Sequence, residues 1–297
     1  MKSFLCCTTI LAIASPAYAG VRCAGRTLSK AYQDPKSLSL VKAAVRGDAK
    51  SIQALVQGGA NVNHLEPGAV PPLLWAICAD NVEGFEALLK AGADPNLGGT
   101  GEGKGDGKGH GLMENGTIIY EGWSATLMAA GTANPEFLKL ALHYGGDPNA
   151  IKGPRNEHRP LLLAAYFGLF ANMKILVAAG ANINTHHENF QGYTAPELTI
   201  AAGGRYDVAV WLLEQGYSHD LPMLARCAEG TYGSLGSPQQ AWKERLIDML
   251  RAKGMVFPAS FALIKAIKVR DIPSEHMQDL IYGRRDYGDY PLKAKKR

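Results

Sequence analysis

The stretch Arg159–Asn184 constrains the fold most, because its pattern describes a helix–turn–helix unit that cannot be stable alone. Pro160 is placed to begin a first helix, where its missing N–H group costs nothing. Gly168 interrupts this helix, Asn172–Ala178 carries apolar residues at helical spacing, and Gly180 predicts a left-handed end to the second helix. Two short helices leave an apolar face uncovered, so the unit requires similar units on both sides.

Further segments repeat this pattern, and we expect each to form another pair of short helices: Ser37–Asn63, Pro71–Asn96, Ser124–Asn149 and Ala195–Tyr217. The glycines expected to end the second helices are Gly59, Gly92, Gly146, Gly180 and Gly216. Successive spacings are 33, 54, 34 and 36 residues, so the period is close to 33 with one insertion between the second and third units.

The turn after several of these pairs has a recurring sequence, Gly-Ala-Asp/Asn-x-Asn, as in Gly59–Asn63 and Gly92–Asn96. With this period the pattern resembles the ankyrin-repeat family over roughly residues 37–217. The resemblance implies an all-α solenoid of helix-turn-helix units with short finger turns, about six repeats and a C-terminal cap. In that family a first-helix histidine ties neighbouring repeats by hydrogen bonds. Leucine replaces it here, so apolar packing is expected to do more of this work: Leu74, Leu127, Leu162 and Leu198.

The helical pattern continues beyond Gly216 with a longer period. Leu221–Ala228 and Pro238–Lys253, ended by Gly254, are expected to form a sixth pair, and Pro258–Ile267 and Pro273–Tyr282 a terminal cap. The expected organisation is a signal peptide (1–19), an N-terminal segment (20–36), repeats (37–257, with a Gly-rich insertion at 97–120), capping helices (258–283) and a frayed polar tail (284–297).

The first residues are typical of a bacterial export signal. Lys2 precedes the short apolar run Phe4–Ile13, and Ala17-Tyr18-Ala19 forms a cleavage site before Gly20. A retained membrane anchor is the alternative, but the run is too short to span a bilayer. We therefore expect a periplasmic or secreted protein without a membrane anchor after cleavage. The formal net charge of +4 does not by itself predict a nucleic-acid partner.

Cleavage at this site would leave Cys23, Cys78 and Cys227. An oxidising compartment permits a disulfide. The odd number means that at least one thiol stays outside any internal pair, and the pattern leaves the pairing open. No C-x-x-C spacing is present, so a zinc site or a redox dithiol is not supported.

Candidate chemistry is weak throughout the chain. The loop Gly98–Gly111 contains most of a phosphate-binding motif, but Gly105 stands where the Mg²⁺-binding hydroxyl would be, so a solvated surface loop is favoured. His186–Glu188 lacks further ligands at a defined spacing, and the other histidines have no local nucleophile partner. The basic end Lys293–Arg297 is more typical of a solvated terminus than of a lipid or nucleic-acid site. We expect no catalytic residues, no metal and no cofactor.

Exposed aromatic residues on a repeat array are typical binding hot spots. In the ankyrin family, partners contact the finger turns and the open ends of the first helices. This resemblance selects six candidate partner-binding residues, with packing under the insertion or between fingers as the alternative: Trp123, Tyr166, Phe167, His187, Phe190 and Tyr193.

The leading hypothesis is a monomeric, exported, non-catalytic module that binds a protein partner on its concave face. Three alternatives remain open at this point: an immunity protein that neutralises a periplasmic toxin, a structural or stress-protection factor for a periplasmic enzyme, and a metal-dependent enzyme.

Overall fold

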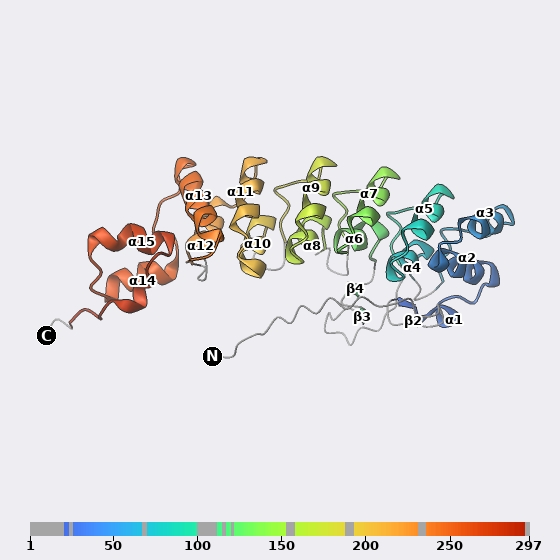
Figure 1. Ribbon diagram of the computed structural model, residues 1–297, viewed down its shortest axis with the longest axis horizontal. Helices are drawn as coiled ribbons and strands as arrows, with labels where there is room; N and C mark the ends of the chain where they lie inside the picture. Colours follow the sequence, from blue (N-terminus) through green and yellow to red (C-terminus); the bar gives the residue numbers. More distant parts are fainter. Residues whose placement is uncertain are drawn as a thin grey trace.

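The protein is described from a computed structural model, which covers residues 21–23, 26–66, 70–99, 112–114, 117–119, 122–152, 158–187, 193–230 and 236–294. Figure 1 shows an elongated stack of helix pairs. The first helices of the pairs form one row and the second helices another, and the connecting finger segments extend from the side of the first helices. The expectation of an all-α repeat solenoid is confirmed.

Six helix pairs follow one another along the stack. They are α2 (Pro35–Arg46) with α3 (Ala49–Gln57), α4 (Pro72–Cys78) with α5 (Val82–Lys90), α6 (Ala125–Ala130) with α7 (Pro135–His143), α8 (Pro160–Tyr166) with α9 (Phe170–Ala178), α10 (Ala195–Gly203) with α11 (Tyr206–Glu214), and α12 (Leu221–Gly230) with α13 (Gln239–Ala252). Each first helix packs on the next first helix, which buries the apolar faces that a single pair would leave open.

The second helices end in glycines with left-handed backbone, as expected at Gly59, Gly92, Gly180 and Gly216. The prediction of Gly146 was wrong, because the left-handed residue is Gly145, with φ of 91°. Gly146 instead takes the place of the buried alanine that follows the glycine in other repeats. A Cβ atom there would lie 2.5 Å from Thr126 Oγ1, so the site excludes any side chain.

Asparagine side chains link the turns of neighbouring repeats. The Oδ1 atom of Asn149 accepts a hydrogen bond from the backbone N–H of Asn182 at 2.7 Å, and its Nδ2 donates to the Gly180 carbonyl at 3.0 Å. Asn63 and Asn96 repeat both contacts on the next turn of the array. We call this series of hydrogen bonds the asparagine ladder. It links neighbouring repeats, whereas the absence of the family's histidine had led us to expect mainly apolar packing there.

The leucines that replace the family's histidine pack against the apolar core, as expected. Leu74, Leu127 and Leu162 are buried, and Leu198 is half-buried against the core. Between the second helices, Phe85 and Phe137 meet edge to face with ring centroids 5.2 Å apart. Packing and the asparagine ladder therefore stabilise the same repeat interfaces.

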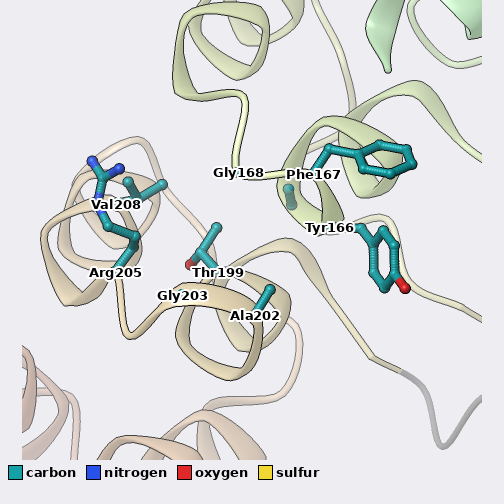
Figure 2. A pocket seen from close by; sticks show the side chains of 9 residues that line it. Tyr166, Phe167, Gly168, Thr199, Ala202, Gly203, Arg205 and Val208 are labelled. Atoms are coloured by element: carbon teal, nitrogen blue, oxygen red, sulfur yellow. The ribbon is translucent and has the colours of Figure 1, made fainter. Parts of the chain in front are cut away.

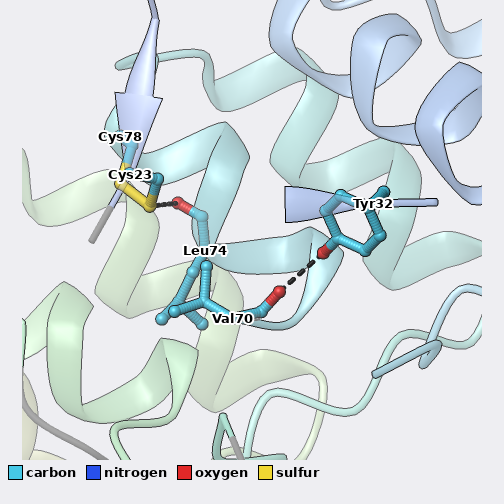
Figure 3. Close-up of a disulfide and its surroundings, with 5 residues drawn as sticks. All are labelled: Cys23, Tyr32, Val70, Leu74 and Cys78. Atoms are coloured by element: carbon cyan, nitrogen blue, oxygen red, sulfur yellow. Dashed lines mark hydrogen bonds between the residues drawn. A yellow bond between two sulfur atoms is a disulfide. The ribbon is translucent and has the colours of Figure 1, made fainter. Parts of the chain in front are cut away.

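The N-terminal segment folds onto the first two repeats (Figure 3). Strands β1 (Arg22–Cys23) and β2 (Arg26–Thr27) form a small antiparallel pair, followed by α1 (Leu28–Ala31). A disulfide joins Cys23 to Cys78 at the end of α4, with Cα atoms 5.7 Å apart. The Tyr32 hydroxyl donates to the Val70 carbonyl at 2.6 Å. The pairing left open by the sequence is thus Cys23–Cys78, and Cys227 lies outside it.

The insertion between the second and third repeats contains an antiparallel pair of strands, β3 (Leu112–Glu114) and β4 (Thr117–Ile119), which the sequence did not predict. Gly98 and Gly99 lie at its base, where Gly99 N–H donates to the Trp123 carbonyl. The rest of the expected Gly98–Gly111 loop and the expected signal peptide lie outside the described residues.

The chain ends in α14 (Phe261–Val269), the 3-10 turn η2 (Ser274–His276), α15 (Met277–Tyr282) and the turn η3 (Tyr287–Asp289). The tail expected to be frayed is held as far as Lys293, because Lys293 N–H donates to the Val269 carbonyl and Asp271 N–H to the Pro291 carbonyl. Among the helices that the structure describes, none combines the length and the apolar character needed to cross a membrane.

Candidate partner-binding surface

The six residues predicted to bind a partner fall into different environments. Tyr166 is 60% exposed and Phe167 is 37% exposed, whereas Trp123 is only 1% exposed. His187 and Tyr193 are half-buried. Phe190 lies outside the described residues. The structure therefore places Tyr166 and Phe167 together on the surface and removes Trp123 from it.

Trp123 is a core residue because it directly precedes the N-cap of α6. Its neighbour Ser124 caps that helix by accepting a hydrogen bond from Leu127 N–H, and both residues are buried. The Trp123 ring meets His158 edge to face, with centroids 5.2 Å apart. Burial lowers the pKa of His158 to about 4, with a smaller contribution from the charge of nearby His187. The alternative interpretation, a packed rather than an exposed aromatic residue, is correct for Trp123.

Tyr166 ends α8 and Phe167 is its C-cap, so both side chains project from the turn that joins α8 to α9. The two rings meet edge to face with centroids 5.2 Å apart. Gly131 of the third repeat lies beside this pair. A Cβ atom at Gly131 would lie 2.8 Å from Leu163 Cδ2, and at an ordinary contact distance of 3.5 Å from the Phe167 ring. The absence of a side chain at Gly131 thus lets Leu163 of α8 pack closely on the preceding repeat.

A pocket of about 120 Å³ opens on the other side of this aromatic pair, between the fourth and fifth repeats (Figure 2). One wall is the end of α8, with Tyr166, Phe167 and Gly168. The opposite wall is the end of α10 and the turn after it, lined by Thr199, Ala202, Gly203 and Arg205, with Val208 contributed by α11.

The pocket is lined by the end of α10, which is longer than α8. Helix α10 has nine residues where α8 has seven, and its last residues are Ala202 and Gly203. Ala202 has only a methyl group and Gly203 has no side chain, so the end of α10 leaves space opposite Tyr166. Sequence reasoning missed this cavity, although the pair Gly203-Gly204 was a signal that α10 ends differently from α8.

The charged group at the pocket is already neutralised. Arg205 Nε and Nη2 donate to the two carboxylate oxygens of Asp207, each at 2.8 Å. The guanidinium holds the pKa of Asp207 below its usual range, mainly through these hydrogen bonds. The pocket therefore offers apolar surface beside a satisfied ion pair, which suits an uncharged side chain.

The finger residues near this surface form a compact polar group. His187 N–H donates to the Tyr193 carbonyl at 2.9 Å, and both residues are half-buried. The rings of His186 and His219 stack with centroids 4.2 Å apart and an interplanar angle of 6°. Across the described part of the chain, no group of three or more His, Cys, Asp or Glu residues is arranged to hold a metal ion.

Comparison with known proteins agrees with this architecture. Residues 114–222 match the family model of ankyrin repeats in three copies. The chain is 29% identical over 139 residues to glycerophosphocholine phosphodiesterase gde1 of Schizosaccharomyces pombe, a match covering 46% of this chain and 10% of that protein. The chain thus spans about a tenth of the length of this curated relative. The fold is an all-α solenoid of ankyrin repeats, and such repeats characterise a protein-interaction module.

Proposed function

We propose that the protein binds a protein partner through the surface centred on Tyr166 and Phe167, with an uncharged partner side chain seated in the adjacent pocket. The observation that carries the proposal is the exposed aromatic pair beside that apolar pocket, on the finger side of a repeat array.

Aromatic residues supply large contact areas at low cost in side-chain entropy, and their truncation usually weakens an interface strongly. Tyr166 additionally has a hydroxyl that can remain in water while its ring is covered. The finger residues His187 and Tyr193 are joined by a backbone hydrogen bond in the segment between α9 and α10, and we include them in the proposed surface.

The experiment is to capture partners with the mature chain and measure affinity for the partner obtained. Tyr166→Ala is expected to weaken binding at least tenfold, since hot-spot truncations cost about 2 kcal/mol or more. Gly203→Leu is expected to weaken it similarly by filling the pocket. A Cβ at Gly203 would meet only Arg205 Cγ, at an ordinary contact distance of 3.5 Å, so this variant should fold normally.

Phe261→Ala is the matched control, because Phe261 is an aromatic residue that is 75% exposed but lies in the C-terminal cap. Its affinity should equal that of the unaltered protein. If Tyr166→Ala and Gly203→Leu both retained full affinity for a partner that binds specifically, the proposed surface would be wrong.

The proposal includes export to the periplasm or outside the cell. It is supported by the N-terminal signal pattern and by the Cys23–Cys78 disulfide, since disulfides persist mainly in oxidising compartments. The test is to express the full chain in a Gram-negative host, fractionate the cells and measure the mass of the product. A periplasmic product beginning at Gly20 is expected, whereas an uncleaved cytoplasmic product would reject export.

A further inference from the structure

The outer side of the first repeat carries a groove that the proposed function does not use. Helices α2 and α3 pack against α4 and α5 on one side, and they form the end of the stack on the other. On this end lies a groove of about 470 Å³, lined by Lys36, Ser39, Lys42, Ala43, Arg46, Ser51, Ala54, Leu55 and Gly58.

The lining of the groove is basic and contains no carboxylate. Lys42 and Arg46 are exposed, lie one helical turn apart on α2, and make no ion pair with any part of the chain that the structure describes. Lys36 differs because its Nζ donates to the Gly58 carbonyl at 2.8 Å, which leaves its charge in place. The groove therefore presents three positive charges that no side chain within it neutralises.

The carboxylates on the same helices already have other roles. Asp34 caps α2 by accepting from Ser37 N–H, and Asp48 caps α3 by accepting from Ser51 N–H and Oγ. Some surface cations elsewhere on the stack form ion pairs, as in Arg205–Asp207, Arg245–Glu214 and Arg284–Glu244. No such pair forms among the residues that line the end groove.

We infer that this groove is a second docking site, and that its occupant is an acidic amphipathic helix of a protein partner. Lys42 and Arg46 are four residues apart, so they match carboxylates separated by one turn on a partner helix, a rise of about 5.4 Å. Beside the cations, Ala54 and Leu55 supply an apolar surface for a small aliphatic side chain. A helix in this position extends the stack in the same way that α4 and α5 extend it on the other side.

The same observations disfavour an anionic membrane as the occupant. A protein that inserts into a bilayer surface requires protruding apolar side chains, and neither α2 nor α3 carries an exposed large hydrophobic residue. The apolar surface beside the cations likewise suits a helix better than a nucleic-acid backbone, whose contacts are mainly with cations and polar groups.

The test uses a displayed library of helical peptides, selected on the mature protein and counter-selected on the double variant Lys42→Glu/Arg46→Glu. The expected peptides carry carboxylates one turn apart and at least one aliphatic residue, and they bind the double variant at least tenfold more weakly. Their affinity should fall as NaCl is raised, because exposed charges are screened. Ala54→Phe, which fills the groove with its charges intact, should weaken binding similarly.

Lys265→Glu/Lys268→Glu is the matched control, because it reverses two charges at the opposite end of the stack. It should leave the affinity of the peptides unchanged. The inference is overturned if no peptide distinguishes the unaltered protein from the groove variant. It is also overturned if the selected peptides are not acidic, or if anionic phosphatidylserine vesicles or a DNA oligonucleotide bind the groove where the peptides do not. These outcomes are independent of Tyr166, so they separate this inference from the proposed function.

Discussion

Asn149 shows how single polar residues align the repeats. Its side chain spans from its own turn to the next, where it pairs with one N–H and one carbonyl of the backbone. Asn184 continues the series by accepting from Ser218 N–H at 2.8 Å. These hydrogen bonds define the spacing between adjacent turns as well as adding to stability, since an amide offers a donor and an acceptor in one plane.

Replacing Asn149 by alanine should destabilise the protein by about 1–2 kcal/mol, because two hydrogen bonds are lost at a site that water reaches. Urea denaturation followed by circular dichroism measures the change. Asn182→Ala serves as the control, since its Oδ1 accepts only from Asn184 N–H within its own turn. Equal effects of the two substitutions would show that the link between repeats contributes nothing beyond the turn itself.

The exposure of single side chains was harder to predict from the sequence than the positions of the helices. Tyr166 and Trp123 are both aromatic residues beside a finger, and the sequence treats them alike. Their exposure differs because Trp123 packs against His158 beside the buried N-cap Ser124, whereas Tyr166 is the last residue of α8 and lies at the turn to α9. Burial of this kind depends on the neighbouring repeat and on His158, neither of which the local pattern of Trp123 contains.

At the scale of helices and strands, local backbone chemistry made most of the fold predictable. Pro160 begins α8 and Gly180 follows α9 as expected, because proline favours the first helical turn and glycine tolerates left-handed backbone. The pocket beside α10 and the N-terminal strands depend on contacts between distant segments. The disulfide likewise joins residues 55 positions apart, so its pairing could not be derived from local signals.

The N-terminal segment is an element whose stability depends on covalent attachment. Its contacts include the buried Tyr32 and the carboxylate of Glu66, which accepts from the N–H groups of Gln33 and Asp34. Cys23 is 1% exposed, while Cys78 is half-buried. The disulfide therefore holds the end of the segment that lies farthest from the Tyr32 and Glu66 contacts.

The double variant Cys23→Ser/Cys78→Ser should lose about 2–4 kcal/mol of unfolding free energy, the usual contribution of a native disulfide. It should also be cut faster by trypsin after the exposed Lys30. Cys227→Ala controls for the loss of a thiol, since Cys227 takes no part in the disulfide. A double variant as stable and as resistant to trypsin as the unaltered protein would show that the segment is held by its non-covalent contacts alone.

At the scale of the whole molecule, the linkage between units changes along the stack. The asparagine ladder runs as far as Ser218. In the turn before α12, Asp220 takes the position that these asparagines have in earlier turns. Its carboxylate accepts instead from Met223 N–H at the start of α12. The cap is joined to the sixth repeat by the buried carboxylate of Glu229, which accepts from the N–H groups of Ala259 and Ser260. Burial raises the pKa of Glu229 and lowers that of the nearby Lys243 to about 8.

Because each unit of a solenoid contacts mainly its neighbours, the loss of one junction should release only the units beyond it. Glu229→Ala removes the acceptor for two N–H groups and the negative charge that faces Lys243, so we expect the cap to open locally. Hydrogen exchange in α14 and α15 should accelerate at least tenfold, while exchange in α6 to α9 stays unchanged. Leaving a buried N–H group without an acceptor typically costs about 1–3 kcal/mol, and two such groups are involved here. The double variant Glu229→Gln/Lys243→Met keeps an acceptor and removes both charges, so it should restore most of the protection. Uniform acceleration along the whole chain would contradict this view, because it would mean that the cap and the repeats unfold as one cooperative unit.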